Sequence, residues 1–202
     1  MSNHSAAGAA AQLSGLGACF SDETNAMSWS DEAFTAVFDE TYPALSRYLE
    51  GLLGRTGAAQ EVAQEALLRL YRLGGGRVPP GAERFWVYRV ATNLALNELR
   101  RTKIRTRLGA AIAAIAGRRD PEPHEQAERA ERDRHLGQAL ERLPADQRAA
   151  LLLREHEDLS YAEISTVLGV SLAKVKSDIF RARTALRADL AGSDDDARRA
   201  VG

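Results

Sequence analysis

Cysteine is almost absent from this sequence, since Cys19 is the one cysteine among 202 residues. A chain with one thiol cannot build an internal disulfide framework, so we expect an apolar core and a reducing compartment. Aromatic residues are also scarce, at 6% of the chain. Ala, Leu, Arg and Glu dominate instead, and this usage favours packed helices over sheets. The composition therefore predicts an all-α protein.

Long hydrophobic runs are missing too. No apolar stretch approaches the roughly 20 residues that span a bilayer, so we expect no membrane insertion. No Lys or Arg precedes Arg47, whereas a secretory leader begins with a basic segment. Together with the single cysteine, these absences predict a cytoplasmic protein.

Catalytic and metal-binding patterns are equally lacking. Cys19 has no organised histidine partner, and His124, Glu128 and His135 do not have the spacing of a compact metal motif. There is no GxxxxGK[ST] phosphate loop, and the glycines at 74–76 follow an expected helix rather than a strand. We therefore expect no catalytic residue, no metal site and no cofactor, and we do not expect an enzyme.

The hydrophobic pattern divides the chain into two helical units. Apolar residues recur at helical spacing from about Asp31, and again from about residue 132. Between these stretches, the Pro- and Arg-containing run at 118–123 breaks the pattern. We expect two small helical domains joined by a flexible linker: tail 1–30, first domain 31–107, linker 108–131, second domain 132–190 and tail 191–202.

The individual helices follow from the same periodicity. Pro43 is expected to kink or divide the first helix, and Tyr71 is placed on the inward face of the second. The Gly and Pro residues at 74–82 cannot continue a helix and predict a loop. The expected helices are 31–53, 58–73, 83–107, 132–142, 145–156, 160–168 and 171–190.

Charge is unevenly distributed, although the formal net charge is only −1. Residues 84–107 contain seven Lys or Arg and one Glu, and residues 174–187 contain five Lys or Arg and one Asp. Two separate basic segments in a nearly neutral protein indicate two local contacts with a polyanion.

The most specific local signal lies at 159–187. Ser160 followed by Glu163 forms a capping box, Gly169 suits the positive φ that ends many helices, and Ser171 can cap a second helix. Two short helices joined by a Gly-containing turn form a helix-turn-helix, whose second helix enters the major groove of DNA. The alternative is an exposed basic helix on a bundle, which the coincidence of cap, turn and charge disfavours.

With this motif in place, the chain resembles the extracytoplasmic-function (ECF) sigma factors, the small two-domain branch of the bacterial sigma-70 family. Region four of that family is similar to LERLPADQRAALLLREHEDLSYAEISTVLGVSLAKVKSDIFRARTALR. Region two is similar to EVAQEALLRLYR followed by FWVYRVATNLALNELRR. The resemblance covers about residues 34–107 and 136–190, and it implies a factor that directs RNA polymerase to promoters.

For region four, the resemblance implies that the second helix of the helix-turn-helix reads the upstream, minus-thirty-five promoter element. Cationic and hydroxyl side chains suit phosphate oxygens and base-edge acceptors. Asp178 departs from the family, which frequently has a basic residue there. The implied contact residues, with Lys174 as an addition to the matching set, are Lys174, Lys176, Ser177, Phe180 and Arg181.

For region two, the resemblance implies that the helix at 61–72 docks on the coiled coil of the largest polymerase subunit. The charged residues of this helix have the alternative of merely solvating its outer face, which is the usual reason for such charges. The residues that match the exposed side of the docking helix are Glu61, Gln64, Glu65, Arg69 and Arg72.

The next helix carries the implied minus-ten recognition and strand-separation surface, with loop 74–84 beside a pocket for a flipped base. Trp86 and Tyr88 invite a stacking role, but aromatic residues on an amphipathic helix more often pack in the core. Asn93 and Asn97 have the alternative of being satisfied polar groups at a helix junction. The implied contacts are Arg84, Arg89, Asn93, Asn97, Arg100, Arg101 and Lys103.

The resemblance further implies three partners: core RNA polymerase, through its coiled coil and flap, promoter DNA, and an anti-sigma protein that clamps both domains. We expect the two domains to be uncoupled without polymerase, so that the free protein binds DNA weakly.

Two other interpretations remain open at this point. One is an autonomous helix-turn-helix regulator, in which 31–107 senses a ligand or forms a dimer. The basic third helix, the Asn pair and the glycine-rich loop speak against a sensor. The other is a protein that sequesters partners through its helices without binding DNA, against which the basic helix at 174–187 speaks.

Overall fold

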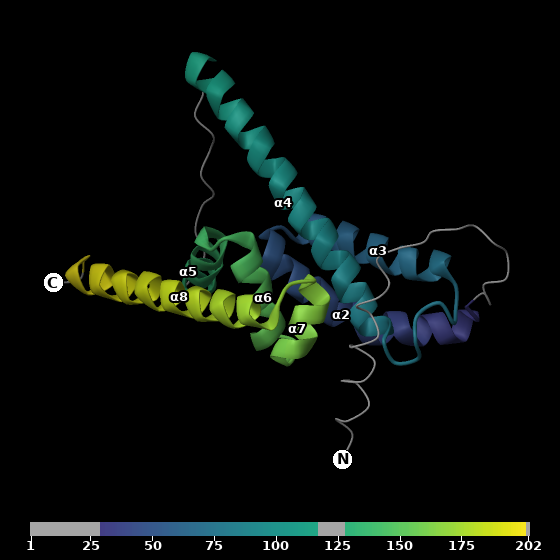
Figure 1. Cartoon of the computed structure of the whole chain (residues 1–202). Coiled ribbons are helices and arrows are strands. Elements are labelled where there is room, and N and C mark those ends of the chain that lie inside the picture. The colour runs from purple at the N-terminus through teal and green to yellow at the C-terminus, as the bar shows by residue number, and fades with distance from the viewer. Residues whose placement is uncertain (1–28, 117–127, 201–202) are drawn as a thin grey trace.

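The computed structural model describes residues 29–116 and 128–200, with side chains described for 29–104 and 135–191. This part of the chain is helical throughout its regular structure and contains no strand (Figure 1). The two-domain, all-α fold class predicted from the sequence is confirmed. The helices are α2 (Asp31–Leu53), α3 (Thr56–Leu73), α4 (Glu83–Ala116), α5 (Glu128–Arg142), α6 (Ala145–Glu155), α7 (Tyr161–Leu168) and α8 (Leu172–Ala200).

Helix α2 begins and ends at residues suited to those positions. The Ser30 side chain accepts a hydrogen bond from the backbone N–H of Ala33 at 3.2 Å, which satisfies one free donor of the first turn. Gly54 ends the helix with φ of 68°, a conformation that costs glycine little. Pro43 lies inside α2 and does not divide it, because buried side chains on both sides of the proline hold the helix on the core.

Helices α2, α3 and α4 form the first unit around a largely aliphatic core. Alanines along α3, at 59, 63 and 66, are fully buried and let the helices approach closely. One polar contact lies inside this core, where the hydroxyls of Tyr48 on α2 and Thr92 on α4 are 2.9 Å apart. Burial raises the pKa of Tyr48 far above its ordinary value, so this hydroxyl stays protonated and holds α2 to α4.

Three helices are longer than the sequence pattern predicted. Helix α4 continues to Ala116 and α5 begins at Glu128, so much of the expected linker at 108–131 is helical. Alanine-rich sequence after residue 109 has high helix propensity, which outweighs the glycine at 109. Helix α8 likewise continues to Ala200, through the expected tail at 191–202. The far ends of α4 and α8 extend away from the packed body (Figure 1). The expected N-terminal tail lies outside the described residues up to residue 28.

The second unit contains the predicted helix-turn-helix. The capping box is present, with the Ser160 N–H donating to Glu163 Oε2 at 2.7 Å and the Glu163 N–H donating to Ser160 Oγ at 3.3 Å. Gly169 ends α7 with φ of 65°, and Ser171 Oγ accepts from the Lys174 N–H at 3.3 Å at the start of α8. The local sequence signals at 160–174 are therefore confirmed in the backbone.

The two units pack directly on each other. Helix α2 contacts α6, and α4 contacts α7, so that buried residues of both units form one continuous core. The contact is close at Gly51, where a Cβ atom would lie 3.2 Å from Leu152 Cδ1. The expectation that the domains are uncoupled in the free protein is therefore wrong for this structure, since apolar surface on α6 and α7 is buried against the first unit.

Candidate nucleic-acid and polymerase interface

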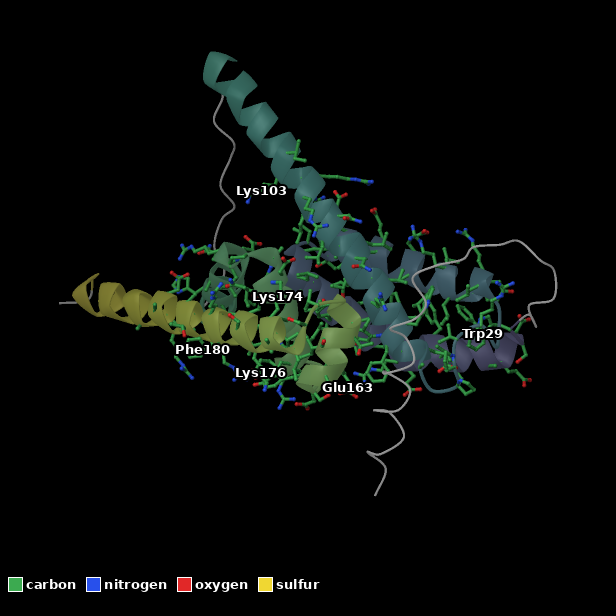
Figure 2. All side chains as sticks on the ribbon, in the orientation of Figure 1. Trp29, Lys103, Glu163, Lys174, Lys176 and Phe180 are labelled. Carbon is green, nitrogen blue, oxygen red and sulfur yellow. The ribbon has the colours of Figure 1, made fainter. Side chains whose placement is uncertain are left out.

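The outer face of α8 presents three of the residues predicted to read DNA. Lys176 and Phe180 are one helical turn apart and project from the same side of the helix (Figure 2). Phe180 is 70% exposed, which is unusual for so large an apolar side chain. Arg181 is exposed beside it, and Ser177 is half-buried. This face combines cations with an exposed aromatic ring, and side chains of these kinds can contact phosphates and base edges.

Lys174 is placed differently from the rest of its predicted set. Its ammonium lies 2.6 Å from Asp178 Oδ2, and the Asp178 side chain is only 7% exposed. The departure from the family at Asp178 therefore does not introduce a negative charge on the side of α8 that is predicted to face DNA. Instead, the carboxylate is buried under Lys174 and neutralised by it, so Lys174 has a structural partner that Lys176 does not share.

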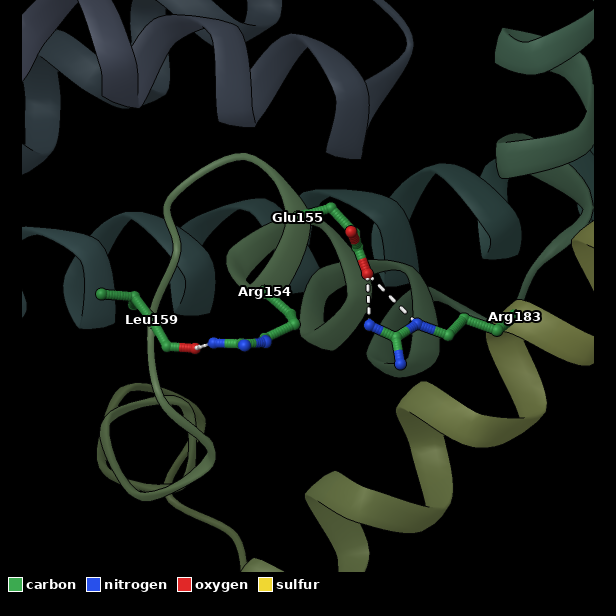
Figure 3. A network of polar contacts seen from close by, with 4 residues as sticks. All are labelled: Arg154, Glu155, Leu159 and Arg183. Carbon is green, nitrogen blue, oxygen red and sulfur yellow. Dashed lines mark hydrogen bonds and ion pairs between the residues drawn. The ribbon is translucent and has the colours of Figure 1, made fainter.

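Polar contacts from α6 fix the orientation of the helix-turn-helix (Figure 3). Arg183 on α8 donates to Glu155 Oε1 through Nη2 at 2.6 Å and Nε at 3.1 Å, and this hydrogen bonding raises the Arg183 pKa. Arg154 donates to the Leu159 carbonyl at 2.9 Å and lies over the Tyr161 ring. Arg183 thus holds α8 on α6, and Arg154 holds the loop that leads into α7. Together they keep the exposed face of Lys176 and Phe180 in one position.

Helix α4 carries a second polar face. Asn93 and Asn97 are exposed and one turn apart, so they are not satisfied groups in a helix junction. Asn97 Oδ1 accepts from Arg100 Nη1 at 3.0 Å, and Arg101 and Lys103 are also exposed. Two amide groups are thus followed along α4 by three cations, all exposed, and such side chains can contact the bases and the backbone of a single strand. Arg89 is half-buried and already has interaction partners.

The first turns of α4 are occupied by the second unit. Arg84 Nη2 lies 2.9 Å from Glu157 Oε2, and the Tyr88 hydroxyl donates to the same oxygen at 2.5 Å. Burial raises the Tyr88 pKa, and the hydrogen bond to Glu157 raises it further. Partial burial alone would lower the Arg84 pKa, but the hydrogen bond to Glu157 and the nearby negative charge raise it. Tyr88 is a core residue, and Trp86 is half-buried against the core, as the sequence analysis favoured.

The outer face of α3 matches the predicted polymerase-docking stripe only in part. Glu61, Gln64, Arg69 and Arg72 are exposed, and Glu65 is half-buried and ion-paired with Arg69 at 2.8 Å. The structure adds two residues that the sequence analysis missed. Leu68 and Tyr71 are each 45% exposed on this helix, although Tyr71 was predicted to face inward. The Tyr71 ring packs on Phe34 of α2, 4.9 Å between centroids, which supports it outside the core.

A groove of about 710 Å³ separates α4 from α5 and α6. Arg100 and Lys103 line it from α4, and Glu141 and Arg148 line it from the second unit. Arg148 is only 5% exposed, and its Nε has no hydrogen-bond partner. Burial lowers the Arg148 pKa, against the opposing charge of Glu141. Sequence reasoning gave no signal for this buried guanidinium.

Across the described part of the chain, no group of three or more His, Cys, Asp or Glu side chains is arranged to hold a metal ion. None of the helices described there has the length and apolarity to cross a membrane.

Comparison with known proteins connects these surfaces to one family. Residues 37–104 match sigma-70 region 2, and residues 134–186 match sigma-70 region 4. The RNA polymerase sigma-H factor of Pseudomonas aeruginosa is 38% identical over 150 residues, which cover 63% of this chain and 70% of that protein. The ECF RNA polymerase sigma factor SigE of Mycolicibacterium smegmatis is 34% identical over 171 residues, covering 84% of this chain and 64% of its own length.

Solved structures show the same fold at lower identity. The structure of CnrH in complex with the cytosolic domain of CnrY is similar with a TM-score of 0.61 and 20% identity, covering 93% of this chain and 97% of that one. The sigma factor RpoE of Bartonella quintana, in complex with the anti-sigma factor NepR, is similar with a TM-score of 0.59 and 20% identity, covering 78% and 96% of the two chains.

Proposed function

We propose, since this chain belongs to the ECF branch of the sigma-70 family of RNA polymerase sigma factors, that its two units read two separate promoter elements. Membership of this family supports a role in promoter-specific transcription initiation. It does not favour the autonomous regulator, for which the first unit would be a sensor rather than region 2.

The minus-thirty-five element is assigned to α8. The observation that carries this assignment is the exposed face of Lys176, Phe180 and Arg181 on the second helix of a capped helix-turn-helix. Cations at the start of that helix reach phosphates and base-edge acceptors when the helix enters the major groove. Lys174, which pairs with Asp178, contributes mainly to the stability of the helix.

The minus-ten element is assigned to α4. Asn93 and Asn97 can each offer a donor and an acceptor to an unstacked base, and Arg100, Arg101 and Lys103 can follow the backbone of the same strand. The free energy for melting the DNA duplex then comes from the binding of separated bases, without nucleotide hydrolysis. Binding to bases that are already unstacked favours the open duplex over the closed one.

Core polymerase is assigned to the outer face of α3. Charged residues there surround two exposed apolar side chains, Leu68 and Tyr71, and such a mixture is typical of a protein–protein contact. Because one structural neighbour is a sigma factor in complex with an anti-sigma factor, and the other is in complex with the cytosolic domain of a second protein, we also propose an anti-sigma protein as a partner. We propose a cytoplasmic protein without catalytic activity of its own.

The proposed function is tested by mixing the purified protein with core RNA polymerase, isolating the complex and transcribing genomic promoter fragments to run-off products. We expect stoichiometric binding and new start sites that depend on the protein. Salt-sensitive binding of duplex DNA by the protein alone, without polymerase binding, would contradict it and support the autonomous regulator.

A further inference from the structure

Glu157 is a buried carboxylate that belongs to one unit and is held by the other. It lies in the loop between α6 and α7, and its side chain is 4% exposed. Its Oε2 accepts from Arg84 and from Tyr88, which are 73 and 69 residues away in the sequence, on α4. We call Arg84, Tyr88 and Glu157 the interdomain cluster.

The residues of the interdomain cluster differ in how much they would be destabilised if the cluster were broken. The Arg84 side chain is 44% exposed, so water can solvate its guanidinium if the carboxylate leaves. Glu157 has no such alternative while α7 stays on α4, because a buried carboxylate without a cation and hydrogen-bond donors is strongly destabilised. The cluster is therefore stable only as a whole in the closed arrangement, and Arg84 is the member that can exchange partners.

The cluster also includes a residue that was predicted from the sequence to contact the minus-ten strand, namely Arg84. A guanidinium binds carboxylate and phosphate through the same donors, so the carboxylate of Glu157 and a DNA phosphate would compete for Arg84. We propose, as an extension of the function proposed above, that Glu157 is an internal competitor for promoter DNA. Its carboxylate takes the place of a phosphate on Arg84 and closes α7 over the first turns of α4.

Closure by Glu157 predicts that the two surfaces proposed to bind DNA are not equally accessible in the free protein. The face of α8 formed by Lys176, Phe180 and Arg181 stays exposed in the closed arrangement, whereas Arg84 is bound to Glu157. Single-stranded DNA must then displace Glu157 before a phosphate can bind Arg84. The apparent affinity for a single strand is reduced by the fraction of molecules that are closed.

The test uses the full-length chain with two spin labels, one on each unit. Exposed positions at Gln60 on α3 and Ala162 on α7 are replaced by cysteine, with Cys19 replaced by serine, and the distance distribution is recorded by pulsed electron resonance. The same samples are titrated with a fluorescent oligo-dT strand at several salt concentrations, and helix content is checked by circular dichroism.

Glu157→Gln keeps the size of the side chain and removes its charge. Losing a charge-assisted hydrogen bond should favour opening by about tenfold, with longer label distances and tighter oligo-dT binding in the same proportion. Asp158→Asn is the matched control, because this exposed neighbour has a φ of 52°, which Asn tolerates, and the substitution changes net charge equally. The control should behave as the unsubstituted protein.

Tyr88→Phe is a second variant that leaves all charges in place. It removes one of the two hydrogen bonds to Glu157 and should produce a smaller opening in the same direction. Unchanged label distances in folded Glu157→Gln would overturn the proposal. Opening without any gain in oligo-dT affinity would also overturn it, because Glu157 would then not compete with DNA. Failure of the chain to bind core polymerase would refute the sigma function while leaving the label distances to decide closure.

Discussion

Helices α8 and α4 both carry residues predicted to contact DNA, but the structure places the two sets differently. On α8, Lys176, Phe180 and Arg181 share an exposed face. On α4, the predicted residues from Asn93 to Lys103 are exposed, whereas Arg84 at its start is bonded to Glu157 of the other unit. The two surfaces predicted to face DNA therefore differ in whether the other unit already binds one of their residues.

This difference follows from how each helix is supported. Contacts from its own unit hold α8, since Glu155 binds Arg183 from behind and leaves the outer face free. Helix α4 is the part of the first unit against which α7 packs, so its accessibility depends on the position of the second unit. A surface held by its own unit can act at once, whereas a surface shared between units responds to their separation.

The largest effect is expected from replacing both cations on the open face of α8. Lys176→Ala combined with Arg181→Ala should lower transcription from a promoter with a minus-thirty-five element by about 100-fold, because each base or phosphate contact contributes about 1–3 kcal/mol. Polymerase affinity should not change, since α3 is untouched. Arg187→Ala, two turns further along, is the control and should have a smaller effect in the same run-off assay. Loss of polymerase binding in the double variant would contradict the division between helices.

A second comparison separates the two lysines of α8. Lys174→Met should lower the free energy of unfolding by about 2 kcal/mol, because Asp178 would remain buried without its cation. Lys176→Met should leave stability within about 0.5 kcal/mol, as is usual for an exposed side chain. Urea denaturation followed by circular dichroism measures both. Equal stabilities would show that the Lys174–Asp178 pair has no structural role.

The polymerase surface is tested by charge reversal on α3. Glu61→Lys combined with Glu65→Lys should weaken binding to core polymerase by about tenfold, since complementary charges across an interface would become repulsive. Asp39→Lys combined with Glu40→Lys makes the same change in net charge on the exposed side of α2 and serves as the control. Fluorescence anisotropy of labelled protein gives both affinities. Equal weakening by the two pairs would indicate a general charge effect rather than docking through α3.

The smallest effect is expected at a single amide of α4. Asn93→Ala should reduce open-complex formation by about fivefold, the equivalent of one hydrogen bond to an unstacked base. Closed-complex formation should be unchanged and serves as the internal reference, measured by heparin challenge. If both complexes are affected equally, Asn93 does not act in strand separation.

Local signals in the sequence were sufficient for the helix-turn-helix. Ser160, Glu163 and Gly169 act on residues within one or two turns of themselves, so their effect can be predicted without a fold. Exposure of Lys176 and Phe180 followed from the same short segment. Helix α3 was also correctly predicted as a helix, but its inward face was not, because Tyr71 packs on Phe34 of α2 rather than in the core.

Contacts between distant segments could not be predicted in this way. Nothing in the sequence around Arg84 indicates that Glu157 binds it, since the two are 73 residues apart and meet only when α7 packs on α4. The same holds for Arg148, whose burial depends on how α6 meets the first unit. Helix lengths were underestimated where glycine or charged residues suggested an end, as at 109 in α4, because propensity is summed over the whole segment.

Permanganate footprinting of promoter DNA, which detects unpaired thymines, tests the central claim most directly. Core polymerase with this protein, in the absence of nucleotides, should expose thymines in the minus-ten element but not in the minus-thirty-five element. The double variant of Lys176 and Arg181 should lose this reactivity together with promoter binding. Fully paired DNA in a stable polymerase complex, or melting that requires ATP, would contradict the account.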